Sequence, residues 1–460
     1  MAQEKAHATT DQDVDFDVIV IGGGPAGSTI SPLLAEKGWR VLQLEKDHHP
    51  RFHIGESLLP MNLEIFEKLG VLQQVRDIGV FKPGAEFNLS PEESNGHNTV
   101  KALTYYFKDA LNPSVDHAYQ VRRSELDALL FRNSSAKGVE TREGIRVTDV
   151  ELGRGTSDIK TVKARDEAGE EHTWNARYIV DTSGRDTFLS RKLGLMRKHP
   201  RHSSAAIFGH FDNVTRREGP DGGNISICWF EHGWFWMIPL KDGSMSVGAV
   251  CWPEYLKTRQ SDLKSFLWDT IKLCPAVHDR MAGATLIDDA ARATGNYSYV
   301  SSRMSGPGYL LVGDAYAFVD PVFSSGVYLG MSSAVLAADV VDGSLRNPRA
   351  EAALQRRYEK RVRTAIKRFS WFIFRFTSPV MRKLFMGPRN NFSMQQAVIS
   401  MLAGDVSGKR TPIALPLLMF KSVYYTYSVL HAGQTLPAWW RRVRNRRIKF
   451  TGGTTSQDPM

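Results

Sequence analysis

A glycine-rich turn near the start of the chain limits the fold more than any other feature of the sequence. Residues 17–22 (DVIVIG) are apolar and β-branched, as expected of one buried parallel strand. Gly22, Gly24, Ala26 and Gly27 follow in the pattern Gly-x-Gly-x-x-Gly. The first glycine permits a tight turn, the second lets the backbone approach a pyrophosphate, and the third lets a helix pack closely on the strand. The turn therefore predicts a dinucleotide-binding βαβ unit.

The residues after the turn complete that unit. Helical spacing runs over residues 25–37, with Pro32 inside, where it lacks a hydrogen-bond donor and should kink or destabilise the helix. Residues 39–45 (WRVLQLE) predict the second strand, and a helix N-terminus between the strands favours bound phosphate. Glu45 ends this strand, about 20 residues after the turn, where its carboxylate can accept hydrogen bonds from a ribose. We place Glu45 and the adjacent Lys46 among the cofactor-binding residues.

A second buried strand with an acidic end lies much later in the chain. Residues 309–314 (YLLVGD) end in Gly313 and Asp314, and a helix is expected over 325–343. A carboxylate at this place can hold the ribityl chain of a flavin. Together with Glu45, it makes FAD the expected cofactor.

The remaining patterns predict an α/β protein in which a Rossmann-type FAD-binding domain carries an inserted antiparallel β-sheet substrate domain and a helical C-terminal region. We expect a disordered leader over 1–15, an FAD-binding module over 16–345 and a helical region with a basic tail over 346–460. The antiparallel sheet parts are expected at about 80–115 and 200–300. Further helices are predicted at 60–80 and 119–137, strands of a meander at 145–175, and a buried strand at 178–183.

Composition indicates which partners, metal sites and cellular location to expect. The net charge of +10 favours acidic partners such as anionic cofactors, acidic carrier proteins, anionic lipid or nucleic acid. Three widely spaced cysteines favour neither a disulfide framework nor a zinc site, and the polar N-terminus lacks the apolar segment of a signal peptide. The clustered His48, His49 and His53 lack the carboxylate pattern of a metal site. We expect a cytoplasmic protein with no resident metal, no nucleic-acid partner and no membrane-spanning helix.

Five segments together resemble the flavin-dependent halogenases, and more widely the FAD monooxygenases and geranylgeranyl reductases. They are GGGPAG (22–27), PRFHIGES (50–57), YQVRRSELD (119–127), DTSG (181–184) and GDAYAFVDP (313–321). The resemblance extends from about residue 16 to about residue 345. It implies that Arg51 and Arg123 lie against the phosphates or the ring edge of FAD.

Two further motifs separate halogenases from their relatives. Trp234-x-Trp236-x-Ile-Pro resembles a halogenase signature whose indoles crowd the flavin and are thought to block oxygenation of the substrate. The run from Phe318 through Pro321 to Gly326 resembles a halogenase helix start beside the flavin ring. The resemblance implies that backbone N–H groups at Ser325 and Gly326 hold the halide, as a helix N-terminus holds other anions.

Lys82, in VFKPGAEF (80–87), matches the lysine of the halogenase family. By that resemblance it is catalytic and hydrogen-bonds or captures the hypohalous acid that reduced FAD (FADH2), O2 and chloride or bromide produce. A compact ammonium whose pKa falls readily on burial suits this role. Because the chain has no second nucleotide fingerprint, we expect a separate flavin reductase as a partner.

One residue departs from the tryptophan halogenases. They carry a catalytic glutamate just before the serine of the Phe318–Gly326 motif, where this chain has Phe323. The departure favours phenols, pyrroles or aromatics tethered to an acyl or peptidyl carrier protein. The aromatic and basic residues after 365 are expected to form helices that close the substrate pocket, and they leave docking of an acidic carrier or contact with a membrane surface open.

Two alternatives remain from the sequence. One is an FAD monooxygenase or a geranylgeranyl-reductase-like enzyme, which would not depend on halide. The other is a flavoprotein without catalytic activity that binds a partner through its basic tail.

Overall fold

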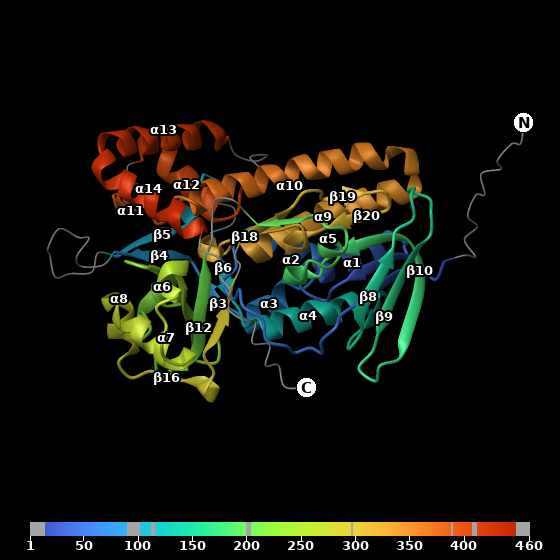
Figure 1. Ribbon diagram of the computed structural model, residues 1–460, viewed down its shortest axis with the longest axis horizontal. Helices are drawn as coiled ribbons and strands as arrows, with labels where there is room; N and C mark the ends of the chain where they lie inside the picture. Colours follow the sequence, from blue (N-terminus) through green and yellow to red (C-terminus); the bar gives the residue numbers. More distant parts are fainter. Residues whose placement is uncertain are drawn as a thin grey trace, which may run out of the picture.

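The computed structural model describes residues 14–89, 102–111, 116–198, 204–295, 298–387, 390–406 and 412–447. Figure 1 shows two β-sheets next to each other, with the C-terminal helices lying across one side of both. Of the predicted leader, residues 1–13 lie outside the described residues. Asp15 is described, and its backbone N–H donates a hydrogen bond to the carbonyl of Asn175.

The first sheet is built around the predicted βαβ unit. Strand β1 (Phe16–Ile21) lies between β2 (Val41–Leu44) and β10 (Glu171–Asp181), and both neighbours run parallel to it. Strands β7 (Glu140–Arg142) and β20 (Tyr309–Leu311) extend the parallel arrangement on the two sides, so the order is β20-β10-β1-β2-β7. Five of the six residues of β1 are buried, which explains the apolar run in the sequence.

Three further strands complete this sheet. β19 (Ser305–Gly306) pairs antiparallel with β20. β8 (Arg146–Glu151) and β9 (Lys160–Arg165) form an antiparallel meander with the first half of β10. This arrangement confirms the meander predicted for residues 145–175.

The helices on the first sheet correct two predicted boundaries. The single helix expected over 60–80 is two helices, α2 (Asn62–Leu69) and α3 (Leu72–Ile78). Gly70 between them has φ of 76°, a left-handed conformation that ends α2. The helix expected over 119–137 is α4 (Arg123–Ala136), because Ala118–Gln120 form strand β6.

Helix α1 (Gly27–Ala35) packs against α4 and against α9 (Ser325–Arg346), which contains the helix predicted at 325–343. Pro32 lies inside α1, as predicted, and all residues of α1 from Gly27 to Leu34 are buried. The short helix α5 (Phe188–Lys192) follows β10.

The second sheet has the strand order β16-β12-β15-β14-β13-β4-β5, with β17 paired to β12. Neighbouring strands are antiparallel except β13 and β4, which run parallel because they come from distant parts of the chain. The strands are β4 (Gly84–Asn88), β5 (Ala102–Tyr106), β12 (Ala205–Asp212), β13 (Ile225–Phe230), β14 (Gly233–Pro239), β15 (Met245–Cys251), β16 (Thr285–Leu286) and β17 (Arg292–Thr294). Helices α6 (Pro253–Leu256), α7 (Leu263–Lys272) and α8 (Pro275–His278) accompany this sheet, and α7 packs against β12 and β15.

The described residues also form two small sheets, one of two strands and one of three. Strand β3 (Val80–Lys82) pairs antiparallel with β6, and β18 (Ser298–Ser301) pairs with both β11 (Met196–Lys198) and β21 (Ala317–Val319). The C-terminal helices are α10 (Glu351–Ile373), α11 (Pro379–Met386), α12 (Met394–Leu402), α13 (Ala414–Leu430) and α14 (Ala432–Arg447). Among the described residues, no helix combines the length and the apolar character needed to cross a bilayer.

Candidate active site

A cavity of about 760 Å³ runs between the two sheets, a volume typical of cofactor sites. Residues predicted to bind the cofactor or to shield it line this cavity at both ends: Gly22, Gly24, Ala26, Glu45, Lys46, Arg51, Arg123, Trp234, Trp236, Asp314, Pro321 and Gly326. Gly27, Gly313, Ser325 and Lys82 were also predicted, but they are not on its wall.

The glycine turn forms one end of the cavity. Gly22 has φ of 115°, and a Cβ atom there would lie 2.5 Å from the carbonyl oxygen of Thr182. A Cβ on Gly27 would lie 2.0 Å from the carbonyl oxygen of Gly22, so Gly27 brings α1 close to the turn. At Gly24 the nearest atom to a Cβ is Arg51 Nη2 at 3.6 Å, so a side chain there would enter the cavity. The turn thus leaves its open space where a phosphate group would lie.

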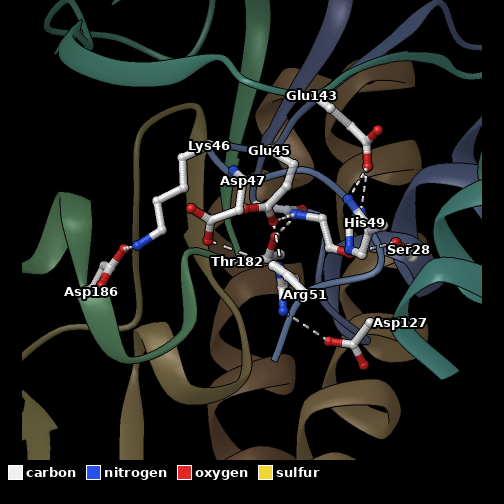
Figure 2. A network of polar contacts seen from close by, with 12 residues as sticks. Ser28, Glu45, Lys46, Asp47, His49, Arg51, Asp127, Glu143, Thr182 and Asp186 are labelled. Carbon is white, nitrogen blue, oxygen red and sulfur yellow. Dashed lines mark hydrogen bonds and ion pairs between the residues drawn. The ribbon is translucent and has the colours of Figure 1, made fainter. Parts of the chain in front are cut away.

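A network of buried charges surrounds this end (Figure 2). Glu45 Oε2 accepts a hydrogen bond from the backbone N–H of Gly23 at 2.7 Å. Arg51 lies between two carboxylates, 3.4 Å from Glu45 and 3.2 Å from Asp127. Burial opposes the charge on Arg51, but the two carboxylates outweigh it and raise the guanidinium pKa. Arg51 Nε is buried, has no hydrogen-bond partner among the described residues and lies 4.0 Å from Asp47 Oδ2.

Asp127 holds the second predicted arginine. Arg123 donates from Nε to Asp127 Oδ1 at 2.8 Å and from Nη2 to Asp127 Oδ2 at 2.9 Å, and also donates to the carbonyl of Ile54. Burial alone would raise the Asp127 pKa, but Arg123 keeps it below its usual range. Lys46 makes a 2.7 Å ion pair with Asp186 on the opposite wall (Figure 2). Both arginines and Lys46 therefore line the cavity in ion pairs with carboxylates.

Asp314 follows β20 in a short 3₁₀ turn, Gly313–Ala315. Burial raises the pKa of its carboxyl to about 6, although Arg185 and Arg123 oppose the shift. Gly313 has φ of 61°, and a Cβ there would lie 3.1 Å from Gly330 Cα of α9. Gly313 therefore supports the turn that aims Asp314 at the cavity.

Two indoles lie on the wall near the far end of the cavity. Trp234 and Trp236 are both buried on β14, with ring centroids 6.0 Å apart. Trp236 Nε1 donates a hydrogen bond to Ser246 Oγ at 3.1 Å. Gly248 on β15 makes room for this indole, since a Cβ there would lie 2.3 Å from Trp236 Cζ2. The indoles are therefore held rigidly, and they narrow the cavity with apolar surface.

The N-terminus of α9 adjoins the same end. Ser324 precedes the helix in a left-handed conformation with φ of 54°, and it lines the cavity together with Gly326. Ser325 lies between them and is buried. The first turn of this 22-residue helix presents free backbone N–H groups and the positive end of its dipole, an arrangement that suits an anion.

Lys82 is buried beside the cavity, and only 1% of its surface is exposed. Its Nζ donates hydrogen bonds of 2.8 Å to Ser57 Oγ and to the carbonyl of Leu58, and it lies 5.4 Å from the ring centroid of Phe107. Burial lowers the ammonium pKa to about 7. Ser57 does line the cavity, so this hydroxyl connects Lys82 to the cofactor space.

A carboxylate–histidine pair was missed by the sequence reasoning. Glu56 lines the cavity, and its Oε1 lies 2.7 Å from Nε2 of His210. Glu56 Oε2 is buried without a hydrogen-bond partner among the described residues. The pair can hold or pass a proton next to Ser57. Glu56 and His210 are 154 positions apart in the sequence, so no local motif indicates the pair.

Aromatic side chains from five segments pack beside the indoles. Phe376 lies 4.8 Å from Trp229, 5.2 Å from Phe323 and 6.4 Å from Trp234, measured between ring centroids. Phe385 of α11 packs 5.3 Å from Phe87. Phe376, after α10, therefore packs against the cavity wall at Trp234, and closure of a substrate pocket by the C-terminal region stays a prediction.

Two of the three clustered histidines contact glutamates, and His53 Nδ1 lies 2.7 Å from the carbonyl oxygen of Ile54. His49 Nδ1 lies 2.6 Å from Glu143, and His48 lies between Glu143 and Glu167. Elsewhere in the described chain, one group contains enough side chains to hold a metal ion, with ligand atoms within 4.8 Å of one another: Asp166, Glu170 and His172. It lies at the turn between β9 and β10, outside the cavity.

A family model described as an FAD binding domain matches residues 15–370. This match covers most of the chain, and the open space beside Gly24 and the guanidinium of Arg51 on the cavity wall fit such a cofactor. The protein is therefore an FAD-binding protein, and the predicted cofactor is confirmed.

Individual relatives define the group more closely. The 1H-pyrrole-2-carbonyl-[peptidyl-carrier protein] chlorinase of Pseudomonas fluorescens is 29% identical over 419 residues, which cover 87% of this chain and 92% of the chlorinase. A tryptophan 2-halogenase of Chondromyces crocatus is 32% identical over 74% of this chain and 65% of its own. The structure of the myxobacterial chondrochloren halogenase CndH is 35% identical, with a TM-score of 0.73 over 86% of this chain and 92% of that chain. The chain belongs to the flavin-dependent halogenases, so the predicted family and fold class are confirmed.

Proposed function

We propose that this halogenase transfers chlorine or bromine to an electron-rich aromatic ring and that Lys82 presents the oxidised halogen to that ring. The observation that carries the proposal is the position of Lys82. It is buried, its pKa is lowered to about 7, and its hydrogen-bond partner Ser57 lines the cofactor cavity. A buried amine next to a redox cofactor has a strong reason to be functional, since burial of its charge is otherwise unfavourable.

The residues around the cavity would hold FAD along its length. The glycine turn and α1 would bind the pyrophosphate, Glu45 the ribose, and Asp314 the ribityl chain, with Arg51, Arg123 and Lys46 balancing the phosphate charge. When bound and reduced, FAD supplies two electrons and two protons that, with O2, a halide ion and one further proton, give a hypohalous acid and water. The sequence has no second nucleotide fingerprint, so we propose that a separate reductase supplies the reduced cofactor.

The far end of the cavity would direct this chemistry towards the halide. Trp234 and Trp236 would cover the flavin ring and keep the organic substrate away from it. Backbone N–H groups at Ser325 and Gly326, in the first turn of α9, would hold the halide.

The ammonium of Lys82 has one N–H group left to donate a hydrogen bond to the hypohalous acid. An ammonium has three N–H donors, and two are engaged by Ser57 and Leu58. The third can donate to the oxygen of a hypohalous acid and make the halogen more electrophilic. The carbon–halogen bond then forms as the halogen–oxygen bond breaks, the ring loses its proton, and the oxygen leaves as water.

The substrate side of the site favours a ring that is reactive without a neighbouring carboxylate. Phe323 is buried, and it packs on Phe376 and Phe385. A phenol or a pyrrole is electron-rich enough to react under these conditions. The chlorinase of Pseudomonas fluorescens is named for a pyrrole on a peptidyl carrier protein. We propose the same substrate class here, with carrier attachment as one form of delivery.

A pair of variants tests the role of Lys82. Lys82→Ala should abolish halogenated product while reduced flavin is still oxidised by O2 in the presence of halide. Lys163→Ala, at an exposed lysine of β9, is the matched control and should keep full activity. Halogenation by Lys82→Ala at the wild-type rate would refute the assignment.

A further inference from the structure

Helices α13 and α14 expose an unusual amount of apolar surface. Nine of the fourteen exposed large hydrophobic side chains in the described chain lie on these two helices. They are Leu415, Leu418, Tyr425, Tyr427, Val429, Leu430, Leu436, Trp439 and Trp440. Scattered exposed hydrophobic residues are ordinary, but a group of this size marks an interaction surface.

Four of the six exposed large hydrophobic residues of α13 form one stripe along the helix. We call Leu415, Leu418, Tyr425 and Val429 the apolar stripe; their spacing of three, seven and four residues places them on one face. The opposite face is already used, because its side chains are buried and the helix contacts α11 and α12. A rotation of α13 about its axis that buried the stripe would expose these buried side chains.

The same part of the chain holds the positive charge of the protein. Residues 360–457 contain 18 of the 59 lysines and arginines but only one of the 49 aspartates and glutamates, Asp405. The rest of the chain has 41 basic and 48 acidic residues and is therefore negative overall. The net charge of +10 thus belongs to the C-terminal helices and their flanks.

Cations and aromatic rings meet beside the stripe. Lys421 Nζ lies 5.1 Å from the centroid of the Trp371 ring, and Arg375 Nη2 donates a hydrogen bond of 2.9 Å to Tyr425 Oη. Burial, together with the nearby cations of Arg368, Arg375 and Lys367, lowers the pKa of Lys421. Positive charge is therefore crowded beside the stripe, whereas Arg441 and Arg444 of α14 are paired with Glu254.

We propose that the apolar stripe of α13 seats the protein on an anionic lipid surface. Amphipathic helices with aromatic and aliphatic residues on one side and lysine or arginine nearby lie in the membrane interface, where anionic headgroups attract the cations. Tryptophan and tyrosine side chains favour the same depth. The proposal does not depend on the identity of the substrate.

The position of α13 favours lipid over a protein partner. Figure 1 shows α13 as the outermost layer at one end of the molecule, beyond α11, α12 and α14. A peptide or helix from a partner is usually taken into a groove, whereas a stripe on an outer helix can lie flat on a membrane. An acidic carrier protein would match the charge but would not explain aliphatic residues such as Val429, which is 75% exposed.

Vesicle flotation with the FAD-loaded full-length protein tests the proposal. The wild type should float with vesicles of phosphatidylcholine and phosphatidylglycerol, float far less with phosphatidylcholine alone, and be released by added salt. The triple variant Leu415→Gln, Leu418→Gln, Val429→Gln should lose roughly tenfold or more of this binding. The matched control, Leu193→Gln with Leu273→Gln, changes exposed leucines elsewhere and should bind as the wild type does.

Three results would overturn the proposal. The first is a wild type that does not float with anionic vesicles. The second is a dimer, seen by light scattering, that the triple variant dissociates while vesicle binding is absent. The third is capture of an acidic acyl carrier protein, without vesicle binding, that the same variant abolishes. Circular dichroism and FAD binding of the triple variant, both unchanged, would show that its fold is intact.

Discussion

Replacement of Lys82 by methionine should stabilise the protein, and by an amount that depends on pH. Burial lowers the Lys82 pKa from 10.5 to about 7. At 1.36 kcal/mol per pKa unit, this difference corresponds to a cost of about 5 kcal/mol for keeping the ammonium in the folded state. Loss of the hydrogen bonds to Ser57 and Leu58 costs about 1–3 kcal/mol. The net gain at or below pH 7 is therefore about 2–4 kcal/mol.

The sign of the pH dependence follows from the direction of the shift. The folded pKa of Lys82 is the lower one, so the unfolded chain binds more protons than the folded chain between about pH 7 and pH 10.5. In this window the wild type gains stability as the pH rises. The advantage of Lys82→Met is therefore largest at or below pH 7 and shrinks by about 1.4 kcal/mol per pH unit above it.

Urea denaturation followed by tryptophan fluorescence, between about pH 6.5 and 9.5, measures this difference. Lys163→Met is the matched control, because Lys163 lies on the surface in an ion pair with Glu151 and should show a flat difference over this range. A stability difference for Lys82→Met that does not change with pH would refute the reasoning, since it would mean that burial does not penalise the ammonium.

The remaining predictions concern the cofactor and the rate. Gly24→Ala should fold but weaken FAD binding by roughly tenfold or more, measured by flavin fluorescence, because the added Cβ enters the space expected to hold the phosphate. Gly27→Ala should also lower the melting temperature, because its Cβ overlaps the carbonyl oxygen of Gly22. Equal folding and equal affinity in both variants would contradict the assignment of the turn. The halogenation rate should fall as pH rises through about 7, since the ammonium of Lys82 is the donor; a rate that rises there would indicate the neutral amine. Glu45→Gln should raise the Kd for FAD by about tenfold in a titration, and an unchanged Kd would exclude the ribose contact.

The sequence predicted the parts of the site that lie within one local motif. The glycine turn, Glu45 and Asp314 each sit at the end of a buried strand, and strand ends of a parallel sheet meet at one edge. Trp234 and Trp236 alternate along one strand and so share one face. The positions of the glycine turn, Glu45 and Asp314 follow from turn chemistry, and the shared face of the indoles follows from periodicity, whereas the shielding role of the indoles rests on the resemblance to the halogenases.

The parts of the site that the sequence did not predict depend on contacts between segments far apart in the chain. The partner of Glu56 is His210, on a strand of the other sheet, and the aromatic cluster beside the indoles draws Phe376 from the loop after α10. No local pattern indicates either contact. The local sequence also does not indicate that Lys82 is buried, because a lysine before proline is usually on the surface. Its burial results from contacts of Lys82, on β3, with Ser57 and Phe107.

The error over residues 60–80 has a simpler cause. Apolar spacing continues across Gly70, so a single helix was expected, but the left-handed conformation of Gly70 ends α2 and a new helix begins at Leu72. Helical periodicity alone does not reveal a break of one or two residues.

The most direct test of the account is mass spectrometry of reaction products. The protein is supplied with reduced FAD, O2, bromide and a panel of phenols and pyrroles, both free and bound to a carrier protein. The account predicts a brominated aromatic product that requires bromide and disappears in Lys82→Ala. A hydroxylated product in place of a brominated one across the panel, or bromination that persists without Lys82, would contradict it.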